Sequence, residues 1–302
     1  MSTSSTIGPI VDGPPAVDTD RAGPDKKGHT KKRRRIGAWG AFGGLVILLV
    51  VVIGTIGPLL APHDPAAQDL VNRLAGPSRD HLLGTDSLGR DQLSRLLLAT
   101  RISLLASAQA ISIALILGVP AGLLSGYVGG MFEAVANRVA DTFLSIPPIV
   151  LALSVVAALG LGLTNAMVGI GLVYAPRFFR VARASARVTR SMGFVDAART
   201  MGSTPLSTLW HHILPNAMSP LLVQTSVAVG LAVVAESALS FLGAGVQVPD
   251  ASWGSMLRDA ARFMEEAPHL MFPPGIMVTA TVLAFSLLGD TIRDVLGRGG
   301  SR

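Results

Sequence analysis

Five long stretches without a charged residue dominate the pattern of apolar and polar positions along the chain. They cover residues 36–60, 102–132, 142–176, 215–235 and 270–289. About 20 apolar residues are enough to cross the hydrocarbon core of a bilayer as a helix. Runs of this length therefore predict an all-α protein that crosses a membrane several times.

The stretch at 142–176 needs a separate interpretation, because its 35 residues are too many for one spanning helix and few for two. Gly160, Gly162 and Asn165 supply residues suited to a tight turn in its second half. We expect a third span that begins near residue 136 and a fourth that ends near 179. Pro147 and Pro148 should kink the third span, since each removes a helix hydrogen bond.

Charge decides between one span and two in this region. Six arginines follow it, with Asp196 as the one acid among them: Arg177, Arg180, Arg183, Arg187, Arg190 and Arg199. The positive-inside rule places this cluster in the cytoplasm together with the KKRRR run that ends at residue 35. An even number of spans must then precede the cluster, which favours six spans with both termini inside.

Composition agrees with a membrane protein, since 15% of residues are charged against about 25% in soluble domains. Residues 1–35 are rich in small and polar residues, and we expect a disordered cytoplasmic tail. We interpret its basic run as a membrane-orienting cluster and not as a nucleic-acid site. The first span should cover 36–60, and the following extracytoplasmic loop 61–100 should carry a surface helix over 82–98, capped by Asp91. The remaining five spans should lie within 101–297.

A polar segment interrupts the apolar pattern inside the expected cytoplasmic loop 180–216. Apolar residues recur there at helical spacing in two short runs separated by a glycine. The first run is Phe194, Ala197, Ala198 and Met201, and the second is Leu206, Leu209, Trp210 and Ile213. Gly202 should stop the first helix, Thr204 should cap the second with Pro205 at its first position, and Pro215 should end it.

Three interpretations of this helix pair stay open on physical grounds. The two helices could pack on the ends of their own spans, or they could present a knob to a cytoplasmic partner. A DNA-binding helix–turn–helix is a third possibility, but no dimerisation element or surrounding soluble domain supports it.

The segment DAARTMG…HILPN, which runs from residue 196 to 216, resembles the EAA loop of ABC importer permeases. Asp196 stands where that family usually has Glu. Segments 81–104, 235–257 and 273–297 resemble, in the right order, the outer-loop signature and the closing segments of the dipeptide/oligopeptide (peptide/nickel/opine) branch. Together they are similar to the second, C-type permease subunit of such importers.

The resemblance implies a type I importer fold, a bacterial inner-membrane location and a path formed with a second, homologous permease. It also implies a cytoplasmic ATPase, an extracytoplasmic substrate-binding protein and contact with lipid. The residues that it assigns to ATPase coupling are Asp196, Ala197, Ala198, Met201, Gly202, Leu206, Leu209, Trp210, Ile213, Leu214 and Pro215. Peptides are the substrate class of the resembled branch.

Motifs for other chemistry are missing from the sequence. None of the four lysines belongs to a phosphate-binding loop, so ATP hydrolysis is expected on another subunit and this chain is not expected to be an enzyme. His211 and His212 are adjacent and make a poor metal pair, and we expect neither a metal nor a cofactor. The rival interpretation is an ion-coupled secondary transporter that uses Glu236 or Asp290, although both lie at the edges of apolar runs.

Overall fold

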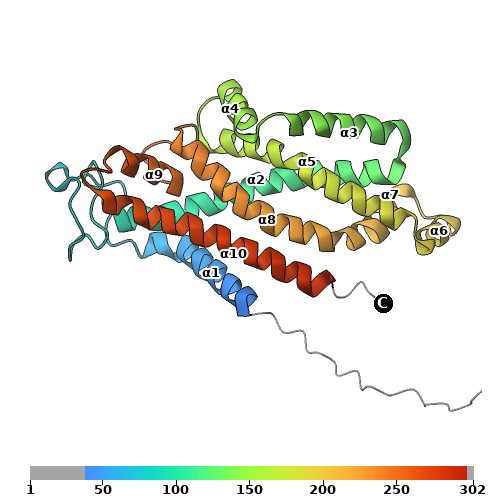
Figure 1. Cartoon of the computed structure of the whole chain (residues 1–302), viewed down its shortest axis with the longest axis horizontal. Helices are drawn as coiled ribbons and strands as arrows, with labels where there is room; N and C mark the ends of the chain where they lie inside the picture. Colours follow the sequence, from blue (N-terminus) through green and yellow to red (C-terminus); the bar gives the residue numbers. More distant parts are fainter. Residues whose placement is uncertain (1–37, 298–302) are drawn as a thin grey trace, which may run out of the picture. The chain divides into compact units, whose positions relative to one another are not determined.

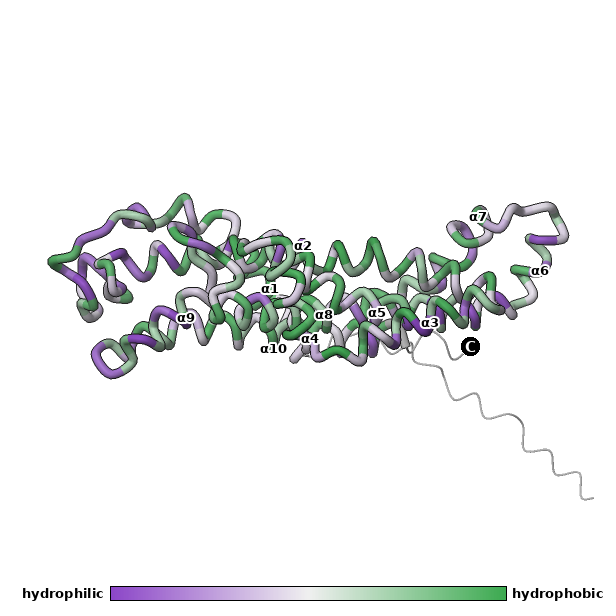
Figure 2. The backbone as a smooth tube through the Cα atoms, turned by 90° about the horizontal axis from the view of Figure 1, so that it is seen from above, coloured by the Kyte–Doolittle hydropathy of each residue, from purple (hydrophilic) through white to green (hydrophobic). Residues whose placement is uncertain are grey.

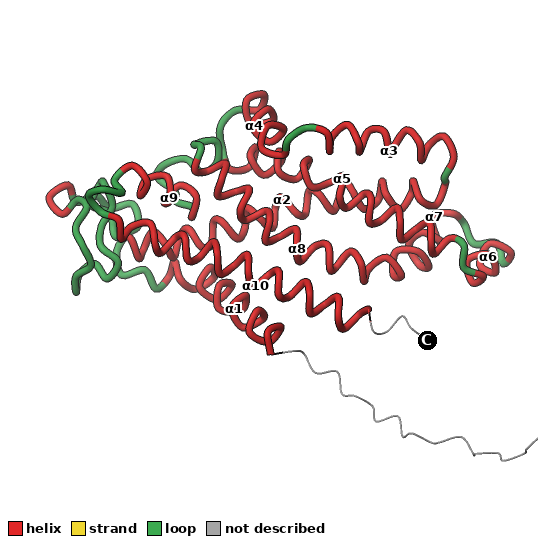
Figure 3. The backbone as a smooth tube through the Cα atoms, viewed as in Figure 1, coloured by secondary structure: helices red, strands yellow, loops and turns green. Residues whose placement is uncertain are grey.

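A computed structural model describes residues 38–297, and these contain helices and loops but no named β-strand (Figure 3). The longer helices are α1 (Ala38–Ile56), α2 (Gln92–Val128), α3 (Gly130–Ser145), α4 (Pro148–Leu159), α5 (Leu163–Arg190), α8 (Leu214–Phe241) and α10 (Phe272–Gly297). The shorter ones are α6 (Gly193–Thr200), α7 (Pro205–Thr208) and α9 (Trp253–Arg262). The expected all-α class is confirmed. The predictions for the tail 1–35 and for its basic run lie outside the described residues.

Within residues 38–297, four helical segments are long and apolar enough to cross a membrane: Trp39–Leu59, Gln92–Val128, Pro205–Phe241 and Pro268–Val295. A fifth span results if α3 and α4, which bend by 93° at their junction, count as one. Helix α5 fails the same criterion, because its second half carries the arginines. Figure 2 shows hydrophobic residues gathered in the middle of the bundle and hydrophilic ones towards its two ends.

The break between α3 and α4 falls at Ile146 and Pro147, where a proline kink was expected. The helix is interrupted there and not merely bent, because the backbone of Pro147 is extended and a new helix, α4, begins at Pro148. The expected tight turn between the third and fourth spans is confirmed at residues 160–162. Gly160 and Gly162 both have positive φ there, and the Asn165 side chain donates to the carbonyls of Leu159 and Gly160 at 3.0 and 3.1 Å.

Helices α2 and α5 pack at unusually close range through glycines four residues apart. A methyl group added at Gly118, Gly122 or Gly126 would lie 2.3–2.4 Å from a backbone carbonyl of α5. Small residues at this spacing allow two helix backbones to approach in a membrane. Helix α3 is attached to α5 by charge instead, with Arg183 2.7 Å from Glu133 and Arg180 2.6 Å from Asp141.

The prediction of a separate surface helix over 82–98 is wrong. Asp91 does cap a helix, since its carboxylate accepts from the backbone N–H of Ser94 at 2.8 Å. That helix, however, is α2 itself, which runs without a break from Gln92 to Val128. The helix begins well before the uncharged stretch 102–132, because the exposed side chain of Arg101 interrupts no backbone hydrogen bond. A charge on the outside of a helix does not end it.

Residues 57–91 and α9 lie together at one end of the bundle, which we call the loop end, and α6 and α7 lie at the opposite end (Figure 1). The loop end is well packed. Trp253, the first residue of α9, is fully buried and its indole N–H donates to the Thr100 hydroxyl of α2 at 3.3 Å. Asp86 pairs there with the guanidinium groups of Arg90 and Arg95 at 2.7 and 3.3 Å.

Candidate functional site

Helices α6 and α7 form a hairpin, residues 193–213, at the end of the bundle opposite the loop end (Figure 1). Its turn has the predicted chemistry. Gly202 has φ +87°, a left-handed conformation that stops α6, and Ser203 N–H donates to the carbonyl of Ala198 at 3.0 Å. This bond spans five residues, as in a Schellman motif. The Thr204 hydroxyl then accepts from the Ser207 N–H at 3.2 Å and caps α7, with Pro205 in its first turn.

The predicted end of the second helix at Pro215 is wrong. Helix α7 passes through a π-turn over Leu209–Ile213 directly into α8, which begins at Leu214. The N–H of Leu214 donates to the carbonyl of Leu209, five residues back. Pro215 occupies the first turn of α8, where a missing N–H does not break the helix. Consequently the second half of the hairpin is the first part of a continuous 37-residue helical segment, Pro205–Phe241, which is long and apolar enough to cross a membrane.

The start of the loop also differs from the prediction of 180–216. Residues 180–190 are the last turns of α5, and the hairpin is reached only after Ser191 and Met192. The arginines of this part of the chain therefore lie on a helix, and three of them, Arg180, Arg183 and Arg187, pair with acids of α3.

The predicted coupling residues divide into an inward and an outward set. Ala198, Leu209 and Ile213 are buried against the bundle, together with Val195, which the sequence pattern missed. Residues 196, 197, 201, 202, 206, 210 and 215 are exposed, and Leu214 is half-buried. Of the expected first face, Phe194, Ala197 and Met201 point outward and only Ala198 points inward. The four residues of the predicted face therefore do not share one side of α6. The buried side consists of Val195 and Ala198, and Phe194, Ala197 and Met201 are exposed.

Four large apolar side chains on the hairpin remain uncovered. The exposed fractions are 44% for Phe194, 81% for Met201, 64% for Leu206 and 54% for Trp210. We call these four residues the hairpin patch. Scattered exposed apolar residues are normal on any protein surface. Four on one short hairpin, at the end of the bundle that also carries charged residues such as Asp196 and Arg199, indicate a contact surface.

Charged groups fix the orientation of α6. The guanidinium of Arg199 stacks over the Tyr127 ring of α2 at 4.9 Å from its centroid, which ties the hairpin to that helix. Asp196 lies 3.7 Å from Arg199, and 69% of its side chain is exposed. The carboxylate therefore faces away from the bundle and is accessible to a partner.

The two acids of the rival ion-coupled interpretation have different environments. Glu236 was expected at the edge of a span, but its side chain is fully buried where α8 meets the loop end. One oxygen accepts from Ser240 at 2.7 Å, and the other has no hydrogen-bond partner among the described residues. Asp290 is exposed on α10. No sequence signal distinguished these two outcomes, since the burial of Glu236 depends on segments near residues 103 and 252.

Comparison with known sequences establishes what this bundle is. Residues 118–301 match the family described as the binding-protein-dependent transport system inner membrane component. The chain belongs to this family. Residues 38–77 match the N-terminal TM domain of oligopeptide transport permease C. The family match covers the hairpin, helices α3 to α5 and α8 to α10, and the last part of α2.

Similar permeases extend the match over most of the chain. The glutathione transport system permease protein GsiD of Pectobacterium atrosepticum is 39% identical over 84% of both chains. The probable D,D-dipeptide transport system permease protein DdpC of Escherichia coli is 40% identical over 83% of this chain and 85% of that protein. The dipeptide transport system permease protein DppC of Alkalihalophilus pseudofirmus is 38% identical over 85% and 84%.

Among solved structures, the inward-facing MetNI methionine ABC transporter is similar in fold, with a TM-score of 0.55 and 20% identity over 66% of this chain and 96% of that one. The chain is thus a multi-pass inner-membrane permease subunit of an ABC importer. It is a transport subunit and not an enzyme, with ATP hydrolysis on a separate subunit and a substrate-binding protein among its partners. These similarities support the ABC interpretation over the ion-coupled one.

Proposed function

We propose that the hairpin of this permease docks the ATPase subunit and passes its movement to α8. The observation that carries the proposal is the hairpin patch, whose apolar side chains lack a cover within the described residues. Helices as short as α6 and α7 are unstable alone, so the inward set holds them on the bundle while the patch faces the partner. A short amphipathic helix seated in a groove is a common mode of such contacts.

The coupling residues then fall into four roles. Met201, Leu206 and Trp210 provide the contact surface, with Asp196 and Ala197 beside them. Ala198, Leu209 and Ile213 anchor the hairpin on the bundle. Gly202 sets the angle between α6 and α7, while Leu214 and Pro215 join the hairpin rigidly to α8, since helix continues through them.

Replacing Gly202 by valine tests this role. A β-branched residue at φ +87° costs about 1–2 kcal/mol in the left-handed conformation, so the turn should rearrange. No neighbouring atom lies within 4 Å of the added Cβ, so the effect is confined to the backbone of the turn. We expect the chain to insert at normal levels while ATP-driven uptake and co-purification of the ATPase fall at least tenfold.

Gly193→Val is the matched control, because Gly193 lies in the same hairpin, has open space around it and does not have positive φ. It should keep both the ATPase contact and uptake. Normal uptake and ATPase recovery in Gly202→Val would show that the hairpin angle has no part in coupling.

We further propose that the hairpin end faces the cytoplasm, with six spans and both termini inside. This count takes α5 as a span in addition to the four apolar segments and the bent α3–α4 pair. The chain has no cysteine, so single cysteines can be introduced without removing any. A membrane-impermeant maleimide should label Arg79→Cys in intact cells and Thr200→Cys only after permeabilisation. The opposite result would invert the topology.

For the cargo, we propose di- or oligopeptides, carried through a path formed with a second, homologous permease in the lipid bilayer. The names of the similar permeases, which refer to dipeptides and glutathione, support this substrate class. A strain that lacks this chain should lose uptake of a labelled dipeptide and regain it on complementation. Uptake that survives loss of the ATPase and collapses with a protonophore would instead favour the ion-coupled alternative.

A further inference from the structure

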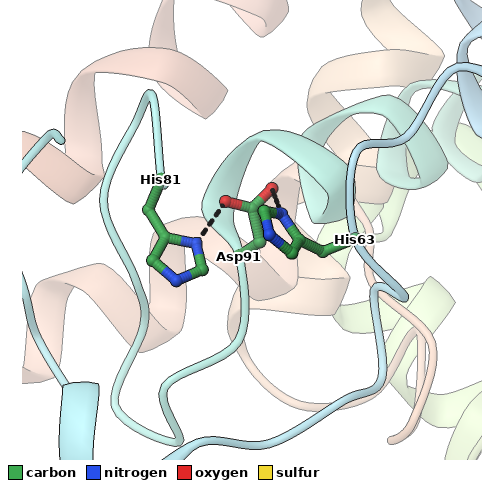
Figure 4. Close-up of side chains that lie close together, drawn as sticks. All are labelled: His63, His81 and Asp91. Atoms are coloured by element: carbon green, nitrogen blue, oxygen red, sulfur yellow. Dashed lines mark hydrogen bonds and ion pairs between the residues drawn. The ribbon is translucent and has the colours of Figure 1, made fainter. Parts of the chain in front are cut away.

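Two histidines and an aspartate from three separate segments converge at the loop end. His63 follows the first span, His81 lies in the loop before α2, and Asp91 caps α2. Figure 4 shows the Asp91 carboxylate between the two imidazole rings. The Nδ1 of His81 lies 2.9 Å from one carboxylate oxygen, and the Nδ1 of His63 lies 3.8 Å from the other.

We propose that His63, His81 and Asp91 form a site for a divalent transition-metal ion of the zinc type. Their candidate ligand atoms all lie within 4.8 Å of one another. A tetrahedral zinc ion with bonds of about 2.0–2.2 Å requires ligand atoms roughly 3.3–3.5 Å apart. The two imidazole–carboxylate separations lie on either side of that range, and the widest separation in the set is at most 4.8 Å. Side-chain rotations that bring the most distant ligand atoms about 1 Å closer would close the site.

The donor set decides the class of metal. Two imidazoles and one carboxylate suit zinc and its transition-metal neighbours, whereas magnesium and calcium prefer oxygen ligands alone. Three protein ligands leave a fourth tetrahedral position open. Solvent can reach it from the side of His63, whose side chain is 41% exposed, against 1% for Asp91.

The surroundings hold the carboxylate in position for binding. Ser94 donates to one Asp91 oxygen through its backbone N–H at 2.8 Å and through its hydroxyl at 2.7 Å. The backbone N–H of His63 donates to the same Ser94 hydroxyl at 3.1 Å, which ties the first loop segment to the α2 cap. Supporting hydrogen bonds of this kind orient metal ligands. Burial alone raises the pKa of Asp91, but the hydrogen bonds from Ser94 and His81 outweigh it and lower the pKa below its usual value.

A bound ion would pin both loop segments to the first turn of α2. This role does not depend on the proposed coupling function, because the site lies at the other end of the bundle from the hairpin (Figure 1). Gly202→Val should therefore leave metal affinity unchanged.

The test uses the full-length chain, purified in detergent with a histidine-free tag, stripped with a chelator and titrated with zinc alone against a chromophoric competitor. We expect one zinc ion per chain, and a rise in melting temperature when zinc is added, because an ion that binds only the folded state stabilises it. His63→Asn and His81→Asn should each weaken zinc binding at least tenfold. Asp91→Asn should do the same while keeping a helix cap, since asparagine is a good N-cap residue.

His211→Asn is the matched control, because His211 is an exposed histidine on the hairpin. It should bind zinc as the wild type does. The proposal is overturned if the wild type takes up no more zinc than the His63→Asn/His81→Asn double variant. It is also overturned if His211→Asn loses as much affinity as the single loop-end variants.

Discussion

The two ends of the bundle differ in how they treat their charged groups. At the loop end, Asp86, Arg90 and Arg95 are all buried and paired with one another. At the hairpin end, Asp196 is mostly exposed, and Met201 leaves 81% of its surface uncovered. The loop end pairs these charged groups within its own chain, although single apolar side chains such as Val71 are exposed there too. The hairpin end leaves a carboxylate and a group of neighbouring apolar side chains uncovered.

This contrast separates stability from association. Substitutions at the loop end remove contacts that the chain makes with itself, so they should lower the stability of the isolated subunit. Substitutions on the hairpin patch remove contacts that a partner would make, so they should leave the isolated subunit intact. Four changes, ordered by their expected effect on stability, test the distinction.

The largest effect is expected from Asp86→Ala. The Asp86 carboxylate pairs with two buried arginines and accepts the backbone N–H groups of Leu88 and Arg90 at 2.9 and 3.0 Å. Its removal leaves buried charge without a counter-ion, which costs about 3–5 kcal/mol. We expect a large drop in melting temperature in detergent.

Asp64→Ala is the control for Asp86, since Asp64 is exposed in the same loop and its side chain accepts one hydrogen bond, from Ala66 N–H at 2.9 Å. It should change the melting temperature little. Equal effects of the two substitutions would mean that the buried ion cluster does not stabilise the loop end.

The next effect is expected from Asp91→Ala, which removes the cap of α2. Loss of an N-cap costs about 0.5–2 kcal/mol, and the hydrogen bond from His81 at 2.9 Å is lost as well. Asp91→Asn keeps the capping geometry and should recover most of the loss when zinc is absent. A melting temperature that is equally low in both variants would show that charge, and not capping, matters at this position.

Local features of both ends could be predicted from the sequence. The stop at Gly202, the cap at Thr204 and the cap at Asp91 all depend on groups within five residues of one another, so a short stretch of sequence specifies them. The turn at 160–162 is specified in the same way by Gly160 and Gly162.

Features that depend on distant segments could not be predicted. The continuity of α2 through Arg101 and of α7 into α8 is decided by packing along whole helices. Glu236 becomes buried because segments far away in the sequence cover it. The two histidines of the proposed metal site are 18 positions apart, which matches no metal-binding sequence motif. The folded loop brings them to Asp91.

A smaller effect is expected from Thr204→Ala, which removes the cap of α7 at the hairpin end. The cap is exposed and belongs to a four-residue helix, so the loss should be about 0.5–1 kcal/mol and local. Hydrogen exchange of residues 193–208 should increase while the global melting temperature stays nearly constant. Thr204→Ser keeps the hydroxyl and is the control. A global loss of stability from Thr204→Ala would mean that the hairpin is part of the folding core.

The smallest effect on stability is expected from the double substitution Met201→Ser/Leu206→Ser on the hairpin patch. Both side chains are more than 60% exposed, so exchange for serine should change the free energy of unfolding by about 0.5 kcal/mol or less. The same change removes apolar surface from the proposed contact and should strongly reduce co-purification of the ATPase. The matched control is Val71→Ser, because Val71 is 91% exposed at the loop end and should leave ATPase binding intact. If the double variant recovers the ATPase as well as the wild type, the uncovered apolar surface of the hairpin is not the docking site.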